Sequence, residues 1–249
     1  MKLLLRWLLL CVIAIATLQL YFVLRIALMA FINPQSTAFQ RSEMRQVATN
    51  SSELRWRQEW LDYDRISNNL KRAVIASEDD SFSQHDGVDW EALEKAWEKN
   101  AKAQQRAESR QNFNNQNGKP STKVKPPKVV GGSTITQQLA KNIFLSGERN
   151  LLRKGQEFIF TLTLEAFLSK KRILEIYLNN VEWGEGVFGA EAAARHYFRK
   201  SASQLSAYEA ARLAVMLPRP KYFEKIPQSG YLSNRASIIT GRMGDARLP

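Results

Sequence analysis

Cysteine and histidine are scarce in this sequence, whose 249 residues include one cysteine, Cys11, and two histidines. One cysteine excludes a disulfide framework within the chain, and so few thiolates and imidazoles exclude a zinc site built from them. The chain also has no internal repeat and no Gly-x4-Gly-Lys-Ser/Thr loop of the kind that binds nucleotide phosphates. Because 44% of the residues are hydrophobic and 24% are charged, wholesale disorder is excluded as well. The length fits one folded domain, with or without an anchor.

Acidic residues are the second deficit, with 24 Asp and Glu against 36 Lys and Arg and a net charge of +12. Such an excess predicts an anionic partner, which can be a nucleic acid, a membrane surface or a phosphate-bearing substrate. The excess is densest between Lys99 and Lys128, where eight basic residues stand against one acidic residue, Glu108. This stretch is either a solvated loop or a flap that faces phosphate or membrane. Composition alone does not choose among these partners.

One long hydrophobic run is present, at residues 7–24 (WLLLCVIAIATLQLYFVL), and only Thr17 and Gln19 interrupt it. Extended back to Leu3, it is long enough as a helix to cross the hydrocarbon core of a bilayer, which needs about 20 residues. A sequence that imitates a cleavage site, AIA at 14–16, lies inside the run with more apolar sequence behind it. We therefore expect a retained signal-anchor and not a cleaved signal peptide.

The charges that flank this run predict its orientation. Lys2 and Arg6 lie on its N-terminal side, which places the N-terminus in the cytoplasm by the positive-inside rule and the body on the outer, periplasmic side. Arg25, on the other flank, weakens this prediction without reversing it. We expect three parts: a signal-anchor transmembrane helix with its flanks (1–32), a juxtamembrane linker (33–62) and a folded body (63–249).

The pattern of the body predicts a mainly α fold with no confident strand. Helices are expected at 68–79, at 90–110 behind an Asp89 N-cap, from the capping-box pattern Thr134-x-x-Gln137, over 158–168 with a break near Ser169, and from Ser206-x-x-Glu209 to the residue before Pro218. Residues 158–168 alternate like a strand, but no glycine or proline interrupts 156–183, which favours a helix. Residues 111–130 contain three prolines and are expected to form a mobile loop.

Three consecutive carboxylates, Glu78-Asp79-Asp80, end the first of these helices. Glu78 follows apolar residues at i−4 and i−8, so an acid stands on an apolar face, at the helix end where the dipole disfavours negative charge. Such local violations concentrate at functional sites. The alternative, which the pattern alone favours, is a helix that ends earlier with its acids solvated. His85 is expected to be a core histidine that donates to a carboxylate.

The segment GGSTITQQLAKN (131–142) leads two glycines into a hydroxyl-capped helix. Free backbone N–H groups and the positive end of the helix dipole meet there, which makes an anion site by geometry. Gln137, Gln138 and Lys141 project along the first turns and would add amide donors and a cation. An ordinary capped helix, with Gln137 as the capping-box residue, is an equally good interpretation.

A cluster of charges follows at RKGQE (153–157). Arg153 and Glu157, at spacing i,i+4, would make a routine surface ion pair worth a few tenths of a kcal/mol. Two cations beside a carboxylate would equally suit a pyrophosphate with a bridging divalent metal. The later segment KKRILEIYLNN (170–180) pairs a basic start with an apolar face, which by itself is typical of a structural helix.

Each of these signals is weak alone, but their order is specific. In this order they resemble the five motifs of the peptidoglycan glycosyltransferase family, which occurs in class A penicillin-binding proteins and in monofunctional biosynthetic transglycosylases. The resemblance covers about residues 63–220, and no Ser-x-x-Lys is present, so the transpeptidase half is expected to be absent. The segments that carry it are EDDSFSQHDG (78–87), GGSTITQQLAKN (131–142), RKGQE (153–157), KKRILEIYLNN (170–180) and GVFGAEAAARHYF (186–198).

The resemblance implies a fold and a reaction. The fold is a lysozyme-like helical lobe with a smaller membrane-associated lobe and the active cleft between them, joined to one N-terminal transmembrane helix. The reaction polymerises lipid II: the 4-hydroxyl of the acceptor's N-acetylglucosamine attacks C1 of the donor's N-acetylmuramic acid, and undecaprenyl pyrophosphate leaves with inversion. The implied partners are lipid II, the growing glycan, the cytoplasmic membrane and other wall-synthesis proteins, and not nucleic acid.

The resemblance also implies a set of site residues. Glu78 corresponds to the general base and Glu157 to the second catalytic carboxylate. Glu157 is expected either near the donor pyrophosphate, where it would hold a divalent cation, Mg or Mn, or beside the oxocarbenium-like centre, which it would help to stabilise. No organic cofactor is implied. The cations for the pyrophosphate correspond to Lys141, Arg153 and Lys154, and the remaining substrate-binding positions are Asp79, Phe82, His85, Ser133, Thr134, Gln137, Gln138 and Asn142.

Two other functions stay compatible with the sequence. A lytic transglycosylase or muramidase shares the lysozyme-like fold and an essential glutamate, but it has no need of the cations at Lys141, Arg153 and Lys154. A membrane-tethered scaffold that binds anionic lipid or glycan without turnover fits the charge of +12 and the aromatic residues that follow the anchor. Loss of function on changing Glu78, with membrane association retained, would separate an enzyme from a scaffold.

Overall fold

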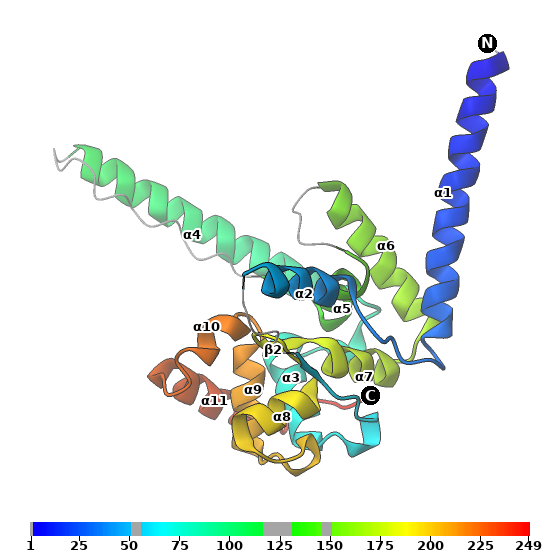
Figure 1. The fold of residues 1–249 in the computed structure, drawn as a ribbon. Coiled ribbons are helices and arrows are strands. Elements are labelled where there is room, and N and C mark those ends of the chain that lie inside the picture. The colour runs from blue at the N-terminus through cyan, green and yellow to red at the C-terminus, as the bar shows by residue number, and fades with distance from the viewer. Residues whose placement is uncertain (1, 51–55, 117–130, 146–150) are drawn as a thin grey trace.

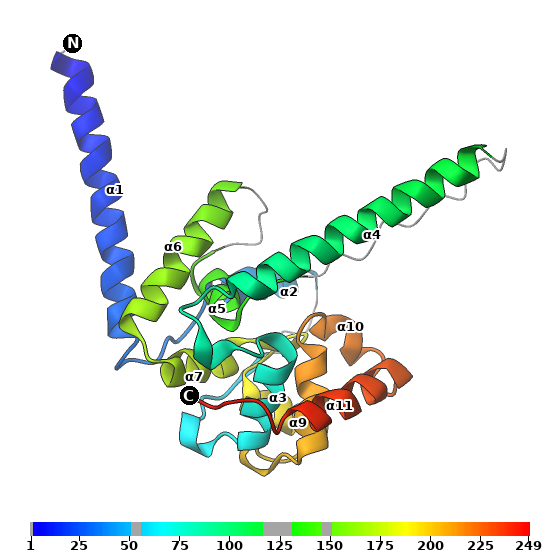
Figure 2. The ribbon, with the colours of Figure 1, turned by 180° about the vertical axis from the view of Figure 1, so that it is seen from behind.

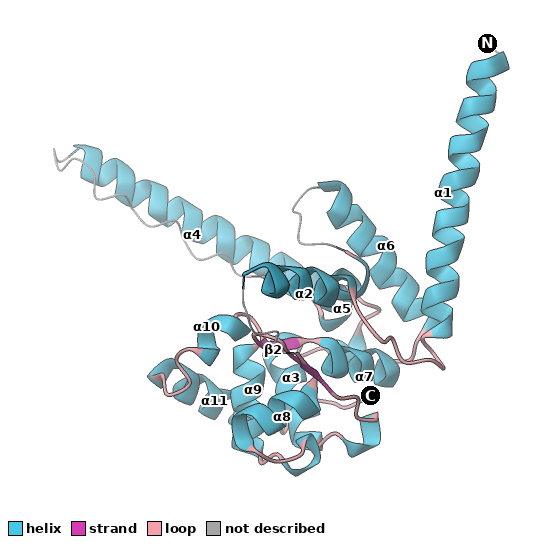
Figure 3. Ribbon diagram, viewed as in Figure 1, coloured by secondary structure: helices cyan, strands magenta, loops and turns pink. Residues whose placement is uncertain are grey.

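The computed structural model describes residues 2–50, 56–116, 131–145 and 151–249 (Figure 1). The described residues are mainly helical, as predicted, and Figure 3 shows how little of the chain is strand. The α-helices are α1 Lys2–Leu28, α2 Ala38–Asn50, α3 Asn68–Glu78, α4 Trp90–Gln116, α5 Ile135–Phe144, α6 Leu151–Phe167, α7 Lys170–Asn180, α8 Ala190–Phe198, α9 Ala207–Met216, α10 Pro220–Glu224 and α11 Gly230–Arg242. Short 3-10 turns lie at Tyr63–Arg65, Phe82–Gln84 and Ala202–Gln204.

The helix starts predicted from hydroxyl residues are confirmed, because their side chains cap free backbone N–H groups. Thr134 and Ser206 each form a complete capping box before α5 and α9. Ser169 caps α7 directly after α6 ends, so the predicted break near this residue is confirmed. Residues 158–167, which alternate like a strand, lie within α6, and this helix begins earlier than predicted, at Leu151. The absence of glycine and proline over 156–183 therefore predicted the structure better than the alternation did.

Two sequence predictions are wrong in part. The loop expected at 111–130 begins later, since α4 continues to Gln116. Residues 111–117 contain no glycine or proline, so nothing in the sequence stops the helix at 110. Residues 117–130 of that prediction lie outside the described residues. Three short strands were not expected, because segments of two or three residues show no alternation.

These strands are β1 Arg57–Gln58, β2 Glu182–Gly184 and β3 Val187–Phe188, in the order β1-β3-β2. β1 is parallel to β3 and β2 is antiparallel to it. The segment 33–62, predicted as a linker, therefore contains both α2 and a strand that pairs with the body.

The described residues share one hydrophobic core, to which two groups of helices contribute. In one, α3 packs against α9 and α11, the arrangement seen from behind in Figure 2. In the other, α5 packs against α6 and α7. Each helix buries an apolar stripe at 3.6-residue spacing, and the fully buried side chains include Leu70, Val74, Leu139, Ile143, Leu164, Ile173, Leu213 and Ile239.

Two helices project away from this body in both views (Figures 1 and 2). α1 is long and apolar enough to cross a membrane, and none of its most hydrophobic window is buried against protein. Only its C-terminal end packs: Ile26 is buried, and the Phe22 ring lies 4.9 Å from that of Phe160 on α6. α4 extends in another direction, with most of its side chains exposed.

Candidate active site

Glu78 is the last residue of α3. Ser67 caps the start of this helix, because its hydroxyl accepts a hydrogen bond from the Leu70 N–H. Leu70 and Val74, eight and four residues before Glu78, are fully buried. The prediction that Glu78 stands on the apolar face of this helix is therefore confirmed.

Hydrogen bonds hold the Glu78 carboxylate in place. Gln138 Nε2, on α5, donates to Oε2 at 3.0 Å, and Ser77 Oγ lies 3.5 Å from Oε1. Burial raises the pKa of Glu78; these two hydrogen bonds and the charge of Arg235 oppose the rise, and the charge of Asp79 adds to it. A glutamate with a raised pKa is suited to take a proton from a substrate hydroxyl.

The alternative prediction, that the acids at 78–80 are solvated beyond the end of the helix, is wrong for two of these three carboxylates. Glu78 is half-buried and Asp79 is buried, because the helix continues to Glu78 and the chain then turns inward. Asp80 alone is exposed, and it forms an ion pair with Arg242 at 2.8 Å.

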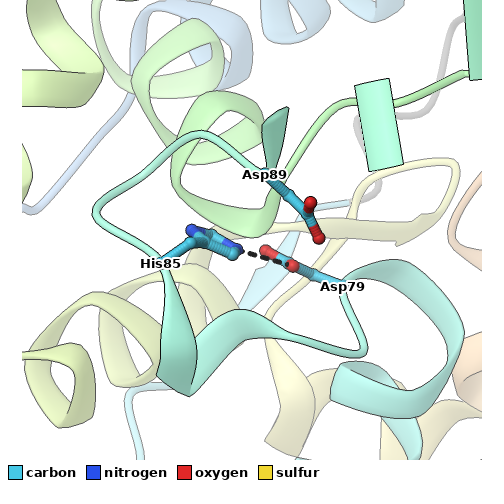
Figure 4. A group of neighbouring side chains, drawn as sticks. All are labelled: Asp79, His85 and Asp89. Carbon is cyan, nitrogen blue, oxygen red and sulfur yellow. Dashed lines mark hydrogen bonds and ion pairs between the residues drawn. The ribbon is translucent and has the colours of Figure 1, made fainter. Parts of the chain in front are cut away.

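Asp79 joins the end of α3 to the start of α5. Its Oδ2 accepts from the Ile135 N–H at 2.9 Å, and its Oδ1 lies 2.9 Å from His85 Nε2 (Figure 4). The Gly87 N–H donates to His85 Nδ1, so Nε2 carries the proton and donates to Asp79. His85 is thus the carboxylate-bound histidine that the sequence predicted.

Asp89 completes the group drawn in Figure 4, in which the nearest ligand-type atoms of Asp79, His85 and Asp89 lie within 4.8 Å of one another. Each member is already engaged by protein groups. Asp89 accepts from the Ser81 hydroxyl and, at 2.7 Å, from the Ala92 N–H, where it caps α4. We assign this group a structural role, because hydrogen bonds within the protein account for its carboxylates.

The N-terminus of α5 is fixed by the same region. Thr134 accepts from the Gln137 N–H, and the Gln137 side chain accepts from the Thr134 N–H. Thr134 Oγ1 also donates to the Gly87 carbonyl at 2.6 Å. The interpretation of Gln137 as a capping-box residue is confirmed, and this cap sets the direction in which Gln138, one residue later, reaches Glu78.

A pocket of about 380 Å³ opens between α5 and α6. It brings together eight of the site residues predicted from the sequence, which come from two separate segments, 133–142 and 153–157. Those residues are Ser133, Gln137, Gln138, Lys141, Asn142, Arg153, Lys154 and Glu157, and Phe39 and Leu145 complete the lining.

Among the described residues, one acidic side chain lines this pocket, that of Glu157. It is only 4% exposed, so it is not part of a routine surface ion pair, and Lys154 Nζ donates to its Oε1. With Lys141 and Arg153 beside them, these residues give the pocket a net positive lining. A pocket of this charge and size suits a pyrophosphate, which carries several negative charges.

A second pocket, of about 450 Å³, adjoins the first and shares Ser133 with it. Glu78 lines this second pocket, together with Asp79, Thr134 and three cations: Lys99, which begins the basic stretch noted in the sequence, and Lys95 and Arg242, which the sequence analysis did not select. The helix spacing of Lys95 and Lys99 was the available signal for them. Glu78 therefore faces one pocket while its partner Gln138 lines the other.

Two predicted substrate-binding residues line neither of the pockets formed by the described residues. Phe82 is fully buried, with Lys170 Nζ 4.6 Å from its ring centre. His85 contacts Asp79 instead of a pocket. Both support the turn that follows Glu78.

The sequence analysis did not select Phe39 or Tyr177 as site residues. Phe39 lines the first pocket but lies in the segment predicted as a linker, and Tyr177, which is hydrogen-bonded to Gln138, lies in a helix interpreted as structural.

Comparison with known proteins places this arrangement in a family. The family model described as Transglycosylase matches residues 44–110 and 121–244. A protein of Herminiimonas arsenicoxydans named biosynthetic peptidoglycan transglycosylase is 50% identical over 247 residues, which cover 99% of this chain and 97% of that protein. The chain belongs to the transglycosylase family.

Two further relatives with the same printed name agree. One, from Janthinobacterium sp. (strain Marseille), is 50% identical over 99% of this chain, and one from Burkholderia orbicola (strain MC0-3) is 48% identical over 93% of it. This member of the transglycosylase family is a peptidoglycan glycosyltransferase with a lysozyme-like helical domain and one N-terminal apolar helix. The non-enzymatic alternative, a membrane-tethered scaffold that binds anionic lipid or glycan without turnover, is thereby set aside.

Proposed function

We propose that this glycosyltransferase polymerises lipid II, with Glu78 as the general base and the pocket between α5 and α6 as the site of the donor pyrophosphate. The observation that carries the proposal is the placement of a half-buried glutamate beside a separate pocket lined by three cations, Lys141, Arg153 and Lys154. The two pockets adjoin at Ser133. Such adjoining sites can hold an acceptor hydroxyl and a donor leaving group on opposite sides of the reacting carbon.

In the proposed step, Glu78 accepts the proton of the acceptor's 4-hydroxyl as its oxygen bonds to C1 of the donor sugar. The bond from C1 to the pyrophosphate oxygen breaks with inversion, and undecaprenyl pyrophosphate takes the electron pair. Lys141, Arg153 and Lys154 stabilise the charge that develops on this leaving group, since preorganised cations act most strongly where charge appears in the transition state.

A divalent cation, Mg or Mn, would be held by Glu157. The donor set fits such an ion only in part, because a single carboxylate faces this pocket among the described residues and Lys154 already binds it. Mg²⁺ commonly takes one or two carboxylates together with substrate phosphates, so the pyrophosphate would supply the other ligands. A bound cation would add charge neutralisation to that of the three basic residues.

The helix α1 is proposed to anchor the enzyme as a single-pass segment with the N-terminus in the cytoplasm and the catalytic domain outside. Its exposed apolar surface and the cations Lys2 and Arg6 support this orientation. Lipid-linked substrate in the same membrane would then reach the site without leaving the bilayer. Other wall-synthesis proteins are proposed as partners.

The test is a lipid II polymerisation assay with purified full-length protein and its Glu78→Gln variant. Gln keeps the shape and a hydrogen bond but cannot take the proton, so glycan synthesis should fall by 10²-fold or more, on the order expected for loss of a general base. Full activity of the variant would refute the assignment of Glu78. Parallel reactions with Mg²⁺, Mn²⁺ or a chelator test the cation, and a Glu157→Gln variant should then lose its response to added metal.

The runner-up enzyme, a lytic transglycosylase or muramidase, is tested by the same protein with finished glycan as substrate. The cationic lining at Lys141, Arg153 and Lys154 argues against it, because glycan cleavage releases no pyrophosphate. Shortening of glycan strands without growth from lipid II would favour this alternative over the proposal.

A further inference from the structure

Tyr177 is a buried tyrosine that the proposed chemistry does not use. It lies on α7 with 0% of its surface exposed. Its hydroxyl donates to Gln138 Oε1 at 2.9 Å. The other end of the same amide, Gln138 Nε2, donates to Glu78 Oε2 at 3.0 Å. One chain of hydrogen bonds therefore runs from the interior of α7 through α5 to Glu78.

The orientation of the Gln138 amide follows from what each neighbour requires. A phenol O–H needs an acceptor and an ionised carboxylate needs a donor, while the amide has its acceptor on one atom and its donors on the other. The observed orientation satisfies both neighbours. A reversed amide would place its carbonyl oxygen against the Glu78 carboxylate and would take away the acceptor of the buried Tyr177 O–H.

We propose that Tyr177 is a positioning residue for polymerisation: its buried hydroxyl fixes the Gln138 amide so that its N–H holds Glu78 in the geometry of a base. The proposal rests on the proposed role of Glu78. It assigns Tyr177 no contact with substrate. Oε2 of Glu78 is occupied by Gln138, while the contact of Oε1 among the described residues is the long one to Ser77 at 3.5 Å, so we assign Oε1 to receive the substrate proton.

Several features make this role specific to the hydroxyl. α7 is held independently: Asn179 donates to the Leu61 carbonyl at 2.9 Å, and Ser169 caps the helix start. The ring of Tyr177 lies within the hydrophobic core and would be retained by phenylalanine. Removing the oxygen alone should therefore leave the packing of α7 intact and free the Gln138 side chain to turn.

The experiment compares Tyr177→Phe with wild-type full-length enzyme in the lipid II assay. We expect kcat to fall about tenfold while KM for lipid II stays within about twofold, because Tyr177 itself lines neither pocket. Without a fixed donor the Glu78 carboxylate is less stabilised, so the acid limb of the kcat profile should move to higher pH. Two charged groups act on Glu78, namely Asp79 and Arg235. Both are the same in the wild-type enzyme and in the variant.

A matched control is available in Tyr197→Phe. Tyr197 is partly buried, and its hydroxyl donates, at 2.8 Å, to the Trp183 carbonyl. Within the described residues this hydrogen bond does not lead to Glu78. This variant should lose a comparable hydrogen bond with kcat and the pH profile unchanged. Equal kcat losses in both tyrosine variants would overturn the proposal, since a general loss of packing would then explain them.

A second variant keeps the test decisive if Tyr177→Phe proves unstable. Gln138→Met removes the amide with little change in length and should give the same fall in kcat and the same shift of the acid limb. The double variant should then be no slower than Gln138→Met alone, because Tyr177 acts through Gln138. Additive losses, or a change in KM only, would overturn the proposal. Activity retained in Glu78→Gln would instead refute the assignment of the base itself.

Discussion

The neighbouring carboxylates of Asp79 and Asp80 differ in burial and in bonding partners, although the two residues are adjacent in the chain. Asp79 accepts one backbone and one histidine hydrogen bond in a buried position, whereas Asp80 beside it is 61% exposed in its side chain and pairs with Arg242 at the surface. Buried hydrogen bonds of a charged group stabilise a fold far more than exposed ion pairs do. The acids at this helix end are therefore not equivalent.

This contrast predicts the effect of Asp79→Asn. The amide would place an N–H against His85 Nε2–H or against the Ile135 N–H, because Asn offers a single acceptor. We expect a loss of about 1–3 kcal/mol in the free energy of unfolding, measured by urea denaturation in detergent. Asp80→Asn is the matched control and should cost less than about 1 kcal/mol. Equal losses for both variants would contradict the structural role given to Asp79.

Charged side chains from three elements, α2, β2 and α10, meet in one cluster. Lys221 on α10 binds Glu43 on α2 and lies 3.5 Å from Glu182 on β2. Burial raises the pKa of Glu182 to about 7; the charges of Glu43 and Glu224 add to the rise and Lys221 opposes it. The folded protein therefore binds a proton at Glu182 more tightly than the unfolded chain does.

The raised pKa predicts how stability changes with pH. The contribution of Glu182 is fully present below the unfolded pKa of about 4.3 and is lost as pH rises toward 7. Glu182→Gln removes this titration, so the variant should gain stability relative to wild type between pH 5 and 8, by at most about 3 kcal/mol. Urea denaturation at both pH values measures the difference.

The control for this prediction is Glu59→Gln. Glu59 is 57% exposed in its side chain and pairs with Arg195 at 3.5 Å. Its variant should show the same pH dependence as wild type. A Glu182→Gln variant that follows the wild-type curve would mean that Glu182 is ionised across this range.

The whole molecule combines a packed body with one unpacked apolar helix. Every described side chain of α1 from Lys2 to Leu20 is exposed, and packing begins only near Phe22 and Ile26. A mostly apolar stretch of this length fits the helix of about 20 residues that is needed to cross a bilayer core of about 30 Å. The body, by contrast, has its own core.

Removal of residues 2–18 tests this division. The shortened enzyme should keep the unfolding temperature of the body in detergent, because no buried contact is lost. It should be released from membranes by an alkaline carbonate wash that leaves the full-length chain in the pellet. Retention of the shortened enzyme after this wash would show that another surface anchors it.

The site residues were predicted from the sequence because the ordered motifs resemble a known family, and the local patterns alone did not decide their roles. Glu78 breaks the polarity of a helix face, and Thr134 and Gln137 form a capping box that depends on residues three apart. The roles of Phe39 and Tyr177 were not within reach. Phe39 comes from a helix far along the chain from the pocket it lines, and Tyr177 has the apolar spacing of any core residue.

The sequence by itself determined the helical class, the apolar N-terminal helix, the caps and the ordered motifs, because these follow from periodicity and from side chains a few residues apart. Only the tertiary structure decided that Asp79 is buried and Asp80 exposed, and that Glu157 lies inside a pocket. It alone also joined Tyr177 to Glu78 through Gln138. Burial and hydrogen bonding between distant segments depend on how helices pack, and that packing leaves no short-range pattern in the chain.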